Sequence, residues 1–150
     1  MPVLIDSPVG PLGFDAADGA VANLIWGRSG DLDEGALADQ LLRELAAYFA
    51  GTLTTFTVPL APRVTAFQHA FSNALCAIPY GETRTYGEMA RDLGVSAQAI
   101  GQACGANPIA ILIPCHRVLA ADGLGGYSGA GGVEAKVALL KLEGAGSLLI

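Results

Sequence analysis

The sequence predicts an α+β protein with a small N-terminal lobe and a larger, mostly helical second part. Short apolar runs separated by glycine and aspartate fill the first 30 residues, which is typical of short strands. From residue 33 onward, apolar residues recur mainly at helical spacing. A chain of 150 residues that is 52% hydrophobic and 15% charged can bury a core and is too apolar to be disordered. We place the two domains at residues 1–62 and 63–150.

In the N-terminal lobe we expect two or three antiparallel strands followed by one helix. Asp18-Gly19 separates the last two apolar runs and is a typical hairpin turn. Leu37, Leu41 and Leu45 then recur on one helical face, and Gly51 is a natural stop for that helix. Residues 51–63, which contain two prolines, are expected to form a strand-like linker to the second part.

In the second part we predict successive helices. An apolar stripe over residues 67–78 indicates a first helix, which Pro79 ends. Residues 85–88 have the S/T-x-x-E pattern of a capping box and begin a second helix. Ser96 is a good N-cap for a third helix of small residues, 97–104. The two short helices fit either a helix-turn-helix or an ordinary helical hairpin, and their spacing leaves both interpretations open.

The last third of the chain combines an apolar run, a glycine-rich loop and one more helix. Residues 109–113 are expected to form a short buried strand or extended segment. Glycine-rich residues 123–132 indicate a loop, and a final helix is predicted from Val133 to about Leu142.

The net charge of −6 is concentrated in the N-terminal lobe. Residues 1–62 have two arginines against eight acidic residues, whereas residues 63–150 have six basic and six acidic residues. The neutral second part could therefore meet a polyanion such as nucleic acid, although without strong electrostatic steering.

Cysteine usage and the N-terminal segment indicate a cytoplasmic protein. The three cysteines include no C-x-x-C pair, which argues against a disulfide framework, and two histidines are few for a zinc cluster. The first residues lack a basic region followed by a long apolar core, so we expect no secretory signal. The apolar runs are also far too short to span a membrane.

Cys115 is the most informative residue of the chain. It follows a buried apolar run and Pro114, and His116 and Arg117 come directly after it. A cationic neighbourhood lowers the pKa of a thiol, and the thiolate is the nucleophile. Cys115 is therefore a candidate nucleophile, with a buried structural cysteine as the alternative. We adopt that structural alternative for Cys76 and Cys104, which lie within helical apolar patterns.

The segment 113–118, Ile-Pro-Cys-His-Arg-Val, resembles the active-site signature of the O6-alkylguanine-DNA alkyltransferases, the methylated-DNA–protein-cysteine methyltransferases. Residues 78–87, 105–108, 126–129 and 142–144 resemble other motifs of that family in the same order. The resemblance covers about residues 63–145. It implies an α/β N-terminal lobe that is RNase H-like and truncated, and a winged helix-turn-helix-like second domain that carries the cysteine.

The resemblance also implies a reaction and a role for each matching residue. The alkyl group of O6-alkylguanine in DNA would pass to Cys115, with O4-alkylthymine as a second candidate substrate. His116 would take the thiol proton through a water held with Glu143, as in other cysteine–histidine–acid relays. Tyr86 would protonate or hydrogen-bond guanine N3. Asn107 would pin the turn before the cysteine.

The same resemblance implies a base pocket and a DNA surface. The backbone carbonyls of Val118 and Cys115 would accept hydrogen bonds from the exocyclic amine of guanine. The backbone amide of Ser128 would donate to guanine O6, and Tyr127 would form one side of the pocket. Double-stranded DNA would bind through its minor groove with the alkylated base flipped out, because a stacked base cannot reach a pocket. The implied DNA contacts are Tyr86, Gly87, Gln98 and Ala121. Gln98 stands where the family normally has an arginine that enters the base stack.

We expect no cofactor, no metal, no membrane partner and a monomer. The zinc of some family members needs N-terminal cysteine and histidine ligands, and residues 1–62 contain neither. A thioether does not hydrolyse, so each molecule would act once. The main alternative is a lesion-binding sensor, whose known examples lack the reactive cysteine. A transcription factor and a cysteine hydrolase are further alternatives, and continued turnover would identify the hydrolase.

Overall fold

The computed structural model describes residues 2–28, 30–31, 35–62, 64–120 and 132–145. These residues form a mixed α+β structure, as predicted. The chain separates into two compact units, Met1–Arg63 and Val64–Ile150, and each is described by itself. Within the described ranges, no helix has both the length and the apolar composition needed to cross a membrane.

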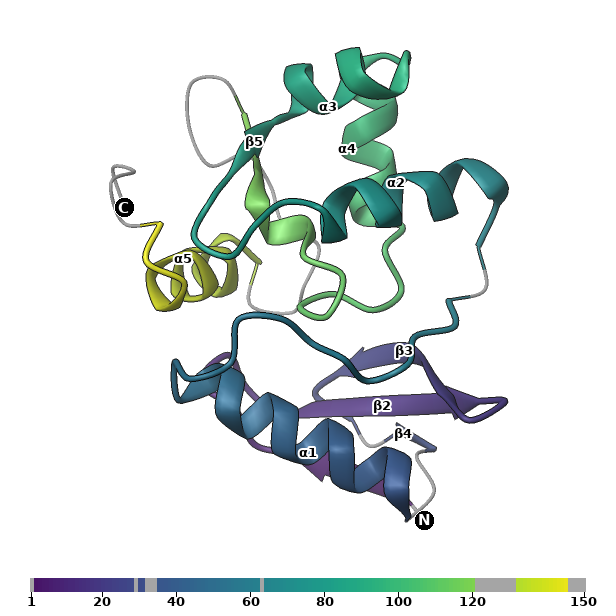
Figure 1. The fold of residues 1–150 in the computed structure, drawn as a ribbon, viewed down its shortest axis with the longest axis vertical. Helices are drawn as coiled ribbons and strands as arrows, with labels where there is room; N and C mark the ends of the chain where they lie inside the picture. The colour runs from purple at the N-terminus through teal and green to yellow at the C-terminus, as the bar shows by residue number, and fades with distance from the viewer. Residues whose placement is uncertain (1, 29, 32–34, 63, 121–131, 146–150) are drawn as a thin grey trace. The chain divides into compact units, whose positions relative to one another are not determined.

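The first unit contains a four-stranded antiparallel sheet and one helix (Figure 1). β2 and β3 form a hairpin at Asp18-Gly19, where both residues have positive φ angles of 52° and 77°, which confirms the predicted turn. The order across the sheet is β3-β2-β1-β4, with β1 at Pro2–Ile5, β2 at Leu12–Ala17, β3 at Ala20–Trp26 and β4 at Gly30–Asp31.

Helix α1, Ala36–Phe49, buries Leu41 and Leu45 on the predicted apolar face. The same face also buries a carboxylate, that of Glu44. Glu44 accepts hydrogen bonds from the backbone N–H groups of Thr57 at 2.7 Å and Val58 at 3.1 Å, so it ties the following segment to the helix. The predicted strand-like linker is mostly irregular, and among its described residues, 51–62, only Leu60 makes a β-bridge, with Val21.

The second unit contains four α-helices among its described residues: α2 Ala66–Cys76, α3 Tyr86–Leu93, α4 Ala97–Gly105 and α5 Gly132–Leu142. The predicted capping box is present, because Thr85 Oγ1 accepts from the Glu88 N–H at 3.0 Å and Glu88 Oε1 accepts from the Thr85 N–H at 2.9 Å. Gly94 ends α3 in the left-handed conformation, at φ 69°, and Ser96 caps α4. These local predictions are confirmed.

The buried face of α2 differs from the predicted apolar stripe. Phe67 and Cys76 are exposed, so the prediction that Cys76 is a buried structural cysteine is wrong. Gln68 is buried instead, and its side-chain amide donates to the Ala103 carbonyl of α4 at 2.8 Å. The polar residue takes an interior position because its amide pairs with a carbonyl there, which the spacing of apolar residues does not reveal.

Residues 109–113 are buried, as predicted, but they form consecutive turns rather than a strand. Ile111 adopts a positive φ of 74°, and Ala110 and Ile113 form an isolated bridge. The chain then enters a short 3₁₀ helix, η1, Cys115–Arg117, and the strand β6, Val118–Leu119. β6 pairs in parallel with β5, Arg84–Thr85.

Candidate active site

The thiol of Cys115 lies at the start of η1, directly after the buried turns. Asn107 fixes those turns with both ends of its side-chain amide. Its Nδ2 donates to the Ile113 carbonyl at 2.8 Å, and its Oδ1 accepts from the Ile109 N–H at 3.1 Å. The Asn107 side chain also hydrogen-bonds the Cys115 thiol. Asn107 therefore sets both the path of the chain into Cys115 and the surroundings of its sulfur.

The parallel pairing of β5 with β6 brings Tyr86 toward the same site. Arg84 lies opposite Val118 and Thr85 opposite Leu119, and Tyr86 follows Thr85 as the first residue of α3. A short parallel ladder thus places two segments side by side, although the paired residues are 34 positions apart in the sequence.

Lys136 is the functional-site residue that the sequence analysis missed. It is fully buried, and its Nζ donates to the Val118 carbonyl at 2.7 Å. The ammonium lies 5.9 Å from the centroid of the Tyr86 ring, and its charge acts on both Cys104 and Cys115. The signal in the sequence is weak, because a lysine beside apolar residues at helical spacing is usually solvent-facing.

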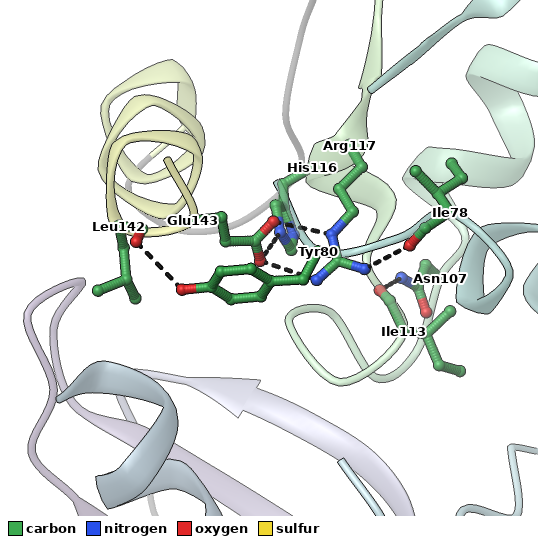
Figure 2. A network of polar contacts seen from close by, with 8 residues as sticks. All are labelled: Ile78, Tyr80, Asn107, Ile113, His116, Arg117, Leu142 and Glu143. Carbon is green, nitrogen blue, oxygen red and sulfur yellow. Dashed lines mark hydrogen bonds and ion pairs between the residues drawn. The ribbon is translucent and has the colours of Figure 1, made fainter. Parts of the chain in front are cut away.

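His116 and Glu143 are brought together in the interior, as the family resemblance implies. His116 Nε2 lies 2.8 Å from Glu143 Oε2, and both side chains have no exposed surface. Arg117 binds the same carboxylate with two further hydrogen bonds, from Nε to Oε1 at 2.8 Å and from Nη2 to Oε2 at 3.0 Å. Figure 2 shows this network, in which one carboxylate serves both basic side chains.

The electrostatics of Cys115 differ from the sequence-based expectation. Burial raises the pKa of the Cys115 thiol, and the Asn107 hydrogen bond and the Lys136 charge reverse that effect only in part. Arg117, expected to lower this pKa, is not among the groups that act on the thiol, and its guanidinium pairs with Glu143 instead. Burial also lowers the pKa of His116 below its usual 6.5, although Glu143 acts in the opposite direction. The site therefore rests with a neutral thiol beside a neutral imidazole at pH 7.

The two remaining cysteines lie in helices α2 and α4. Cys104 is only partly buried, not fully as expected, and desolvation raises the pKa of its thiol to about 12. Cys76 is the last residue of α2.

Two of the residues implied in DNA contact, Gly87 and Gln98, lie on the outside of α3 and α4. Gly87 is exposed in the first turn of α3, and Gln98 is exposed in the first turn of α4. A Cβ atom added at Gly101 or Gly105 would meet no atom within 4 Å, so the outer face of α4 is open at these two positions. The predicted residues Ala121, Tyr127 and Ser128 lie outside the described residues.

Comparisons with known proteins point to one family. Residues 66–145 match the family model described as 6-O-methylguanine DNA methyltransferase, DNA binding domain. A methylated-DNA–protein-cysteine methyltransferase of Mycobacterium tuberculosis is 46% identical over 93% of this chain and 89% of its own length. One from Methanosarcina acetivorans is 56% identical over 68% of this chain and 66% of its own length, which is just under two thirds of that relative.

The fold comparison agrees as well. The crystal structure of Mycobacterium tuberculosis OGT in complex with DNA superposes with a TM-score of 0.84 at 46% identity, over 95% of this chain and 91% of the other. A match of this identity over most of both chains indicates shared ancestry as well as a shared fold. The chain therefore belongs to the family of methylated-DNA–protein-cysteine methyltransferases.

Proposed function

We propose that this protein repairs DNA by direct reversal, moving the alkyl group of O6-alkylguanine onto its own Cys115. The observation that carries the proposal is the buried contact of 2.8 Å between His116 and Glu143, directly beside the buried Cys115. His116 Nδ1 has no hydrogen-bond partner among the described residues, which suits a base that receives a proton there.

The reaction is a nucleophilic displacement at the alkyl carbon. A bond forms between Cys115 Sγ and that carbon while the bond between the carbon and guanine O6 breaks. The thiol proton passes to His116 through a water molecule, and Glu143 stabilises the imidazolium that forms. Tyr86 donates a proton to guanine N3, so guanine leaves as a neutral base. The proton held on His116 then restores Tyr86 through solvent.

The base pocket is assigned to residues around this sulfur. The carbonyl oxygens of Cys115 and Val118 accept from the exocyclic amine of guanine. Val118 already accepts from Lys136, but a carbonyl oxygen has two lone pairs and can serve both donors. Tyr127 and Ser128 complete the pocket in this proposal.

We place the outer face of α4, which carries Gly101 and Gly105, in the minor groove of DNA. Small side chains allow the helix backbone to approach a groove closely, and Gln98 fills the space that the flipped nucleotide leaves. In this proposal, residues 63–150 form a winged helix-turn-helix-like domain that acts as a monomer, and residues 1–62 form a shortened RNase H-like lobe. Gly87, Ala121 and Tyr86 contribute to the same surface.

The deciding experiment is the intact mass of the protein after incubation with duplex DNA that contains one O6-methylguanine. We expect a gain of one CH2 unit per molecule, mapped to Cys115, and no reaction after one equivalent. Cys115→Ala should bind the DNA without gaining mass, while Cys104→Ala should react like the wild type. DNA binding without transfer by the wild type would indicate a lesion sensor, and continued turnover would indicate a hydrolase.

A further inference from the structure

Glu143 holds a position between two basic side chains that are neighbours in sequence. Its Oε2 atom is 2.8 Å from His116 Nε2 and 3.0 Å from Arg117 Nη2, and its Oε1 atom is 2.8 Å from Arg117 Nε. The guanidinium therefore binds the carboxylate with two donors, and the imidazole binds it with one (Figure 2). An ion pair of this two-pronged kind is stronger and more directional than a single contact.

Arg117 is fixed from its other sides as well. Its Nη1 donates to the Ile78 carbonyl at 2.7 Å, and its guanidinium lies 5.8 Å from the centroid of the Tyr80 ring. The Tyr80 hydroxyl in turn donates to the Leu142 carbonyl at 3.1 Å, directly before Glu143. Contacts from the segment after α2 and from the end of α5 thus hold the guanidinium in one orientation. Rotation about the side-chain bonds of Arg117 would break these contacts.

This arrangement decides which group balances the charge of the buried carboxylate. An ionised carboxylate without exposed surface needs a cation nearby. Arginine stays protonated at any pH that a protein tolerates, so Arg117 supplies that charge permanently. His116 then needs to contribute only a neutral N–H. Because a carboxylate can only accept, the imidazole proton lies on Nε2 and the lone pair on Nδ1.

We infer that Arg117 is a positioning residue that keeps His116 neutral and in its Nε2–H form, by acting as the permanent counter-ion of Glu143. The inference rests on the proposed function for its consequence, because only the neutral Nε2–H form can take the Cys115 proton at Nδ1. If Arg117 were absent, His116 would become the nearest cation for Glu143. A doubly protonated imidazole carries a proton on both nitrogens and cannot act as a base.

The other charged groups that face His116 are consistent with this assignment. They are Glu143, which raises the pKa of the imidazole, and Arg117 and Lys136, which lower it together with burial. Lys136 itself donates to the Val118 carbonyl at 2.7 Å. Two cations and one carboxylate thus surround the imidazole ring. Burial and the two cations together outweigh the carboxylate, so the neutral form of the ring is favoured.

The test is the nitrogen NMR spectrum of the histidine rings in the unreacted protein, without DNA. The chain has two histidines, and His69 is exposed on α2, so it serves as an internal reference. In the wild type, we expect His116 to be neutral with its proton on Nε2 at pH 7. Arg117→Met should raise the titration midpoint of His116 by about 1 to 3 pH units, the range for loss of one adjacent charge.

Two more variants separate the effect of the two-donor contact of Arg117 from the effect of its positive charge. Arg117→Lys keeps a charge but not the two-pronged contact, so its midpoint should lie between those of the wild type and Arg117→Met. Lys141→Met removes an exposed lysine of α5 and should leave His116 unchanged. In every variant, the pH at which the alkyl-transfer rate falls on the acid side should shift together with the NMR titration midpoint of His116. A purely structural role of Arg117 would not produce this parallel shift.

A protonated His116 or an Nδ1–H form in the wild type at pH 7 would overturn the inference, as would an unchanged midpoint in Arg117→Lys and Arg117→Met. The wild-type spectrum and Arg117→Lys decide the question even if Arg117→Met does not fold. If the rings behave as expected but the wild type transfers no alkyl group, the proposed function fails and this assignment stands.

Discussion

Replacing Asn107 by alanine should loosen the turns that lead into Cys115 without unfolding the rest of the chain. The substitution leaves the Ile109 N–H without its acceptor at 3.1 Å. It also removes one of two donors to the Ile113 carbonyl, which keeps the Cys115 N–H at 2.8 Å. Ile109 and Ile113 are buried; a buried polar group without a partner costs about 1–3 kcal/mol, and the loss of one hydrogen bond costs about 1 kcal/mol. The expected local destabilisation is therefore about 2–4 kcal/mol.

Hydrogen exchange of residues 109–119, followed by mass spectrometry, is the suitable assay. Tryptophan fluorescence is not, because the single tryptophan, Trp26, lies in the first unit. A loss of 2–4 kcal/mol corresponds to roughly 30- to 1000-fold faster exchange. Asn107→Asp keeps the acceptor for the Ile109 N–H but loses the donor to the Ile113 carbonyl, so it should fall between wild type and alanine. Exchange within threefold of the wild type in Asn107→Ala would refute the reasoning.

The remaining predictions concern pH, charge and DNA. The pKa of folded His116 is lowered, so His116 is neutral above about pH 6.5 and the alkyl-transfer rate should fall only below that value; a rate already falling between pH 8 and 7 would contradict it. Lys136→Met should raise the pKa of Cys115 further, measured as the pH dependence of iodoacetamide alkylation, with Lys136→Arg as the control. Burial raises the pKa of Glu44, but its hydrogen bonds with Thr57, Gln40 and Val58 outweigh this and lower it below 4.5. Stability from Glu44 should therefore be complete above about pH 4.5 and lost as the pH falls through the lowered value, and Glu44→Gln, followed by Trp26 fluorescence in urea, should abolish this loss. Gln98→Arg should speed repair of duplex DNA relative to reaction with the free base, because only duplex substrate requires base extrusion; an unchanged ratio of single-turnover rates would show that Gln98 does not fill the vacated space.

The features that the sequence predicts well depend on residues close together in the chain. The capping box at Thr85, the hairpin at Asp18-Gly19 and the cap at Ser96 each involve contacts within a few residues. Cys115 and His116 are adjacent, so their chemistry could be proposed from spacing alone. The role of Glu143 could not, because it contacts His116 across 27 positions and only the family resemblance connected the two.

The apolar run at residues 109–113 shows why composition alone fails there. Burial was predicted correctly, since the residues are apolar, but burial does not distinguish a strand from a series of turns. The backbone path is decided by a polar residue outside the run, Asn107, which bonds both ends of it. A strand would need a neighbour of similar length, whereas β6 and β5 are only two residues each.

Most of the features that could not be predicted from the sequence involve buried polar side chains, and all of them were missed for the same physical reason. Gln68 and Lys136 each pair with a carbonyl from a segment far away in sequence, and Arg117 with a distant carboxylate. A periodicity argument assigns such residues to solvent, because burial of a polar group is costly until its partner is known. The partner comes only with the tertiary fold. In the active site this reverses an electrostatic conclusion. Arg117 lies two residues from Cys115, yet it pairs with Glu143 and is not among the groups that lower the pKa of the thiol. The thiol therefore depends on His116 to become a nucleophile.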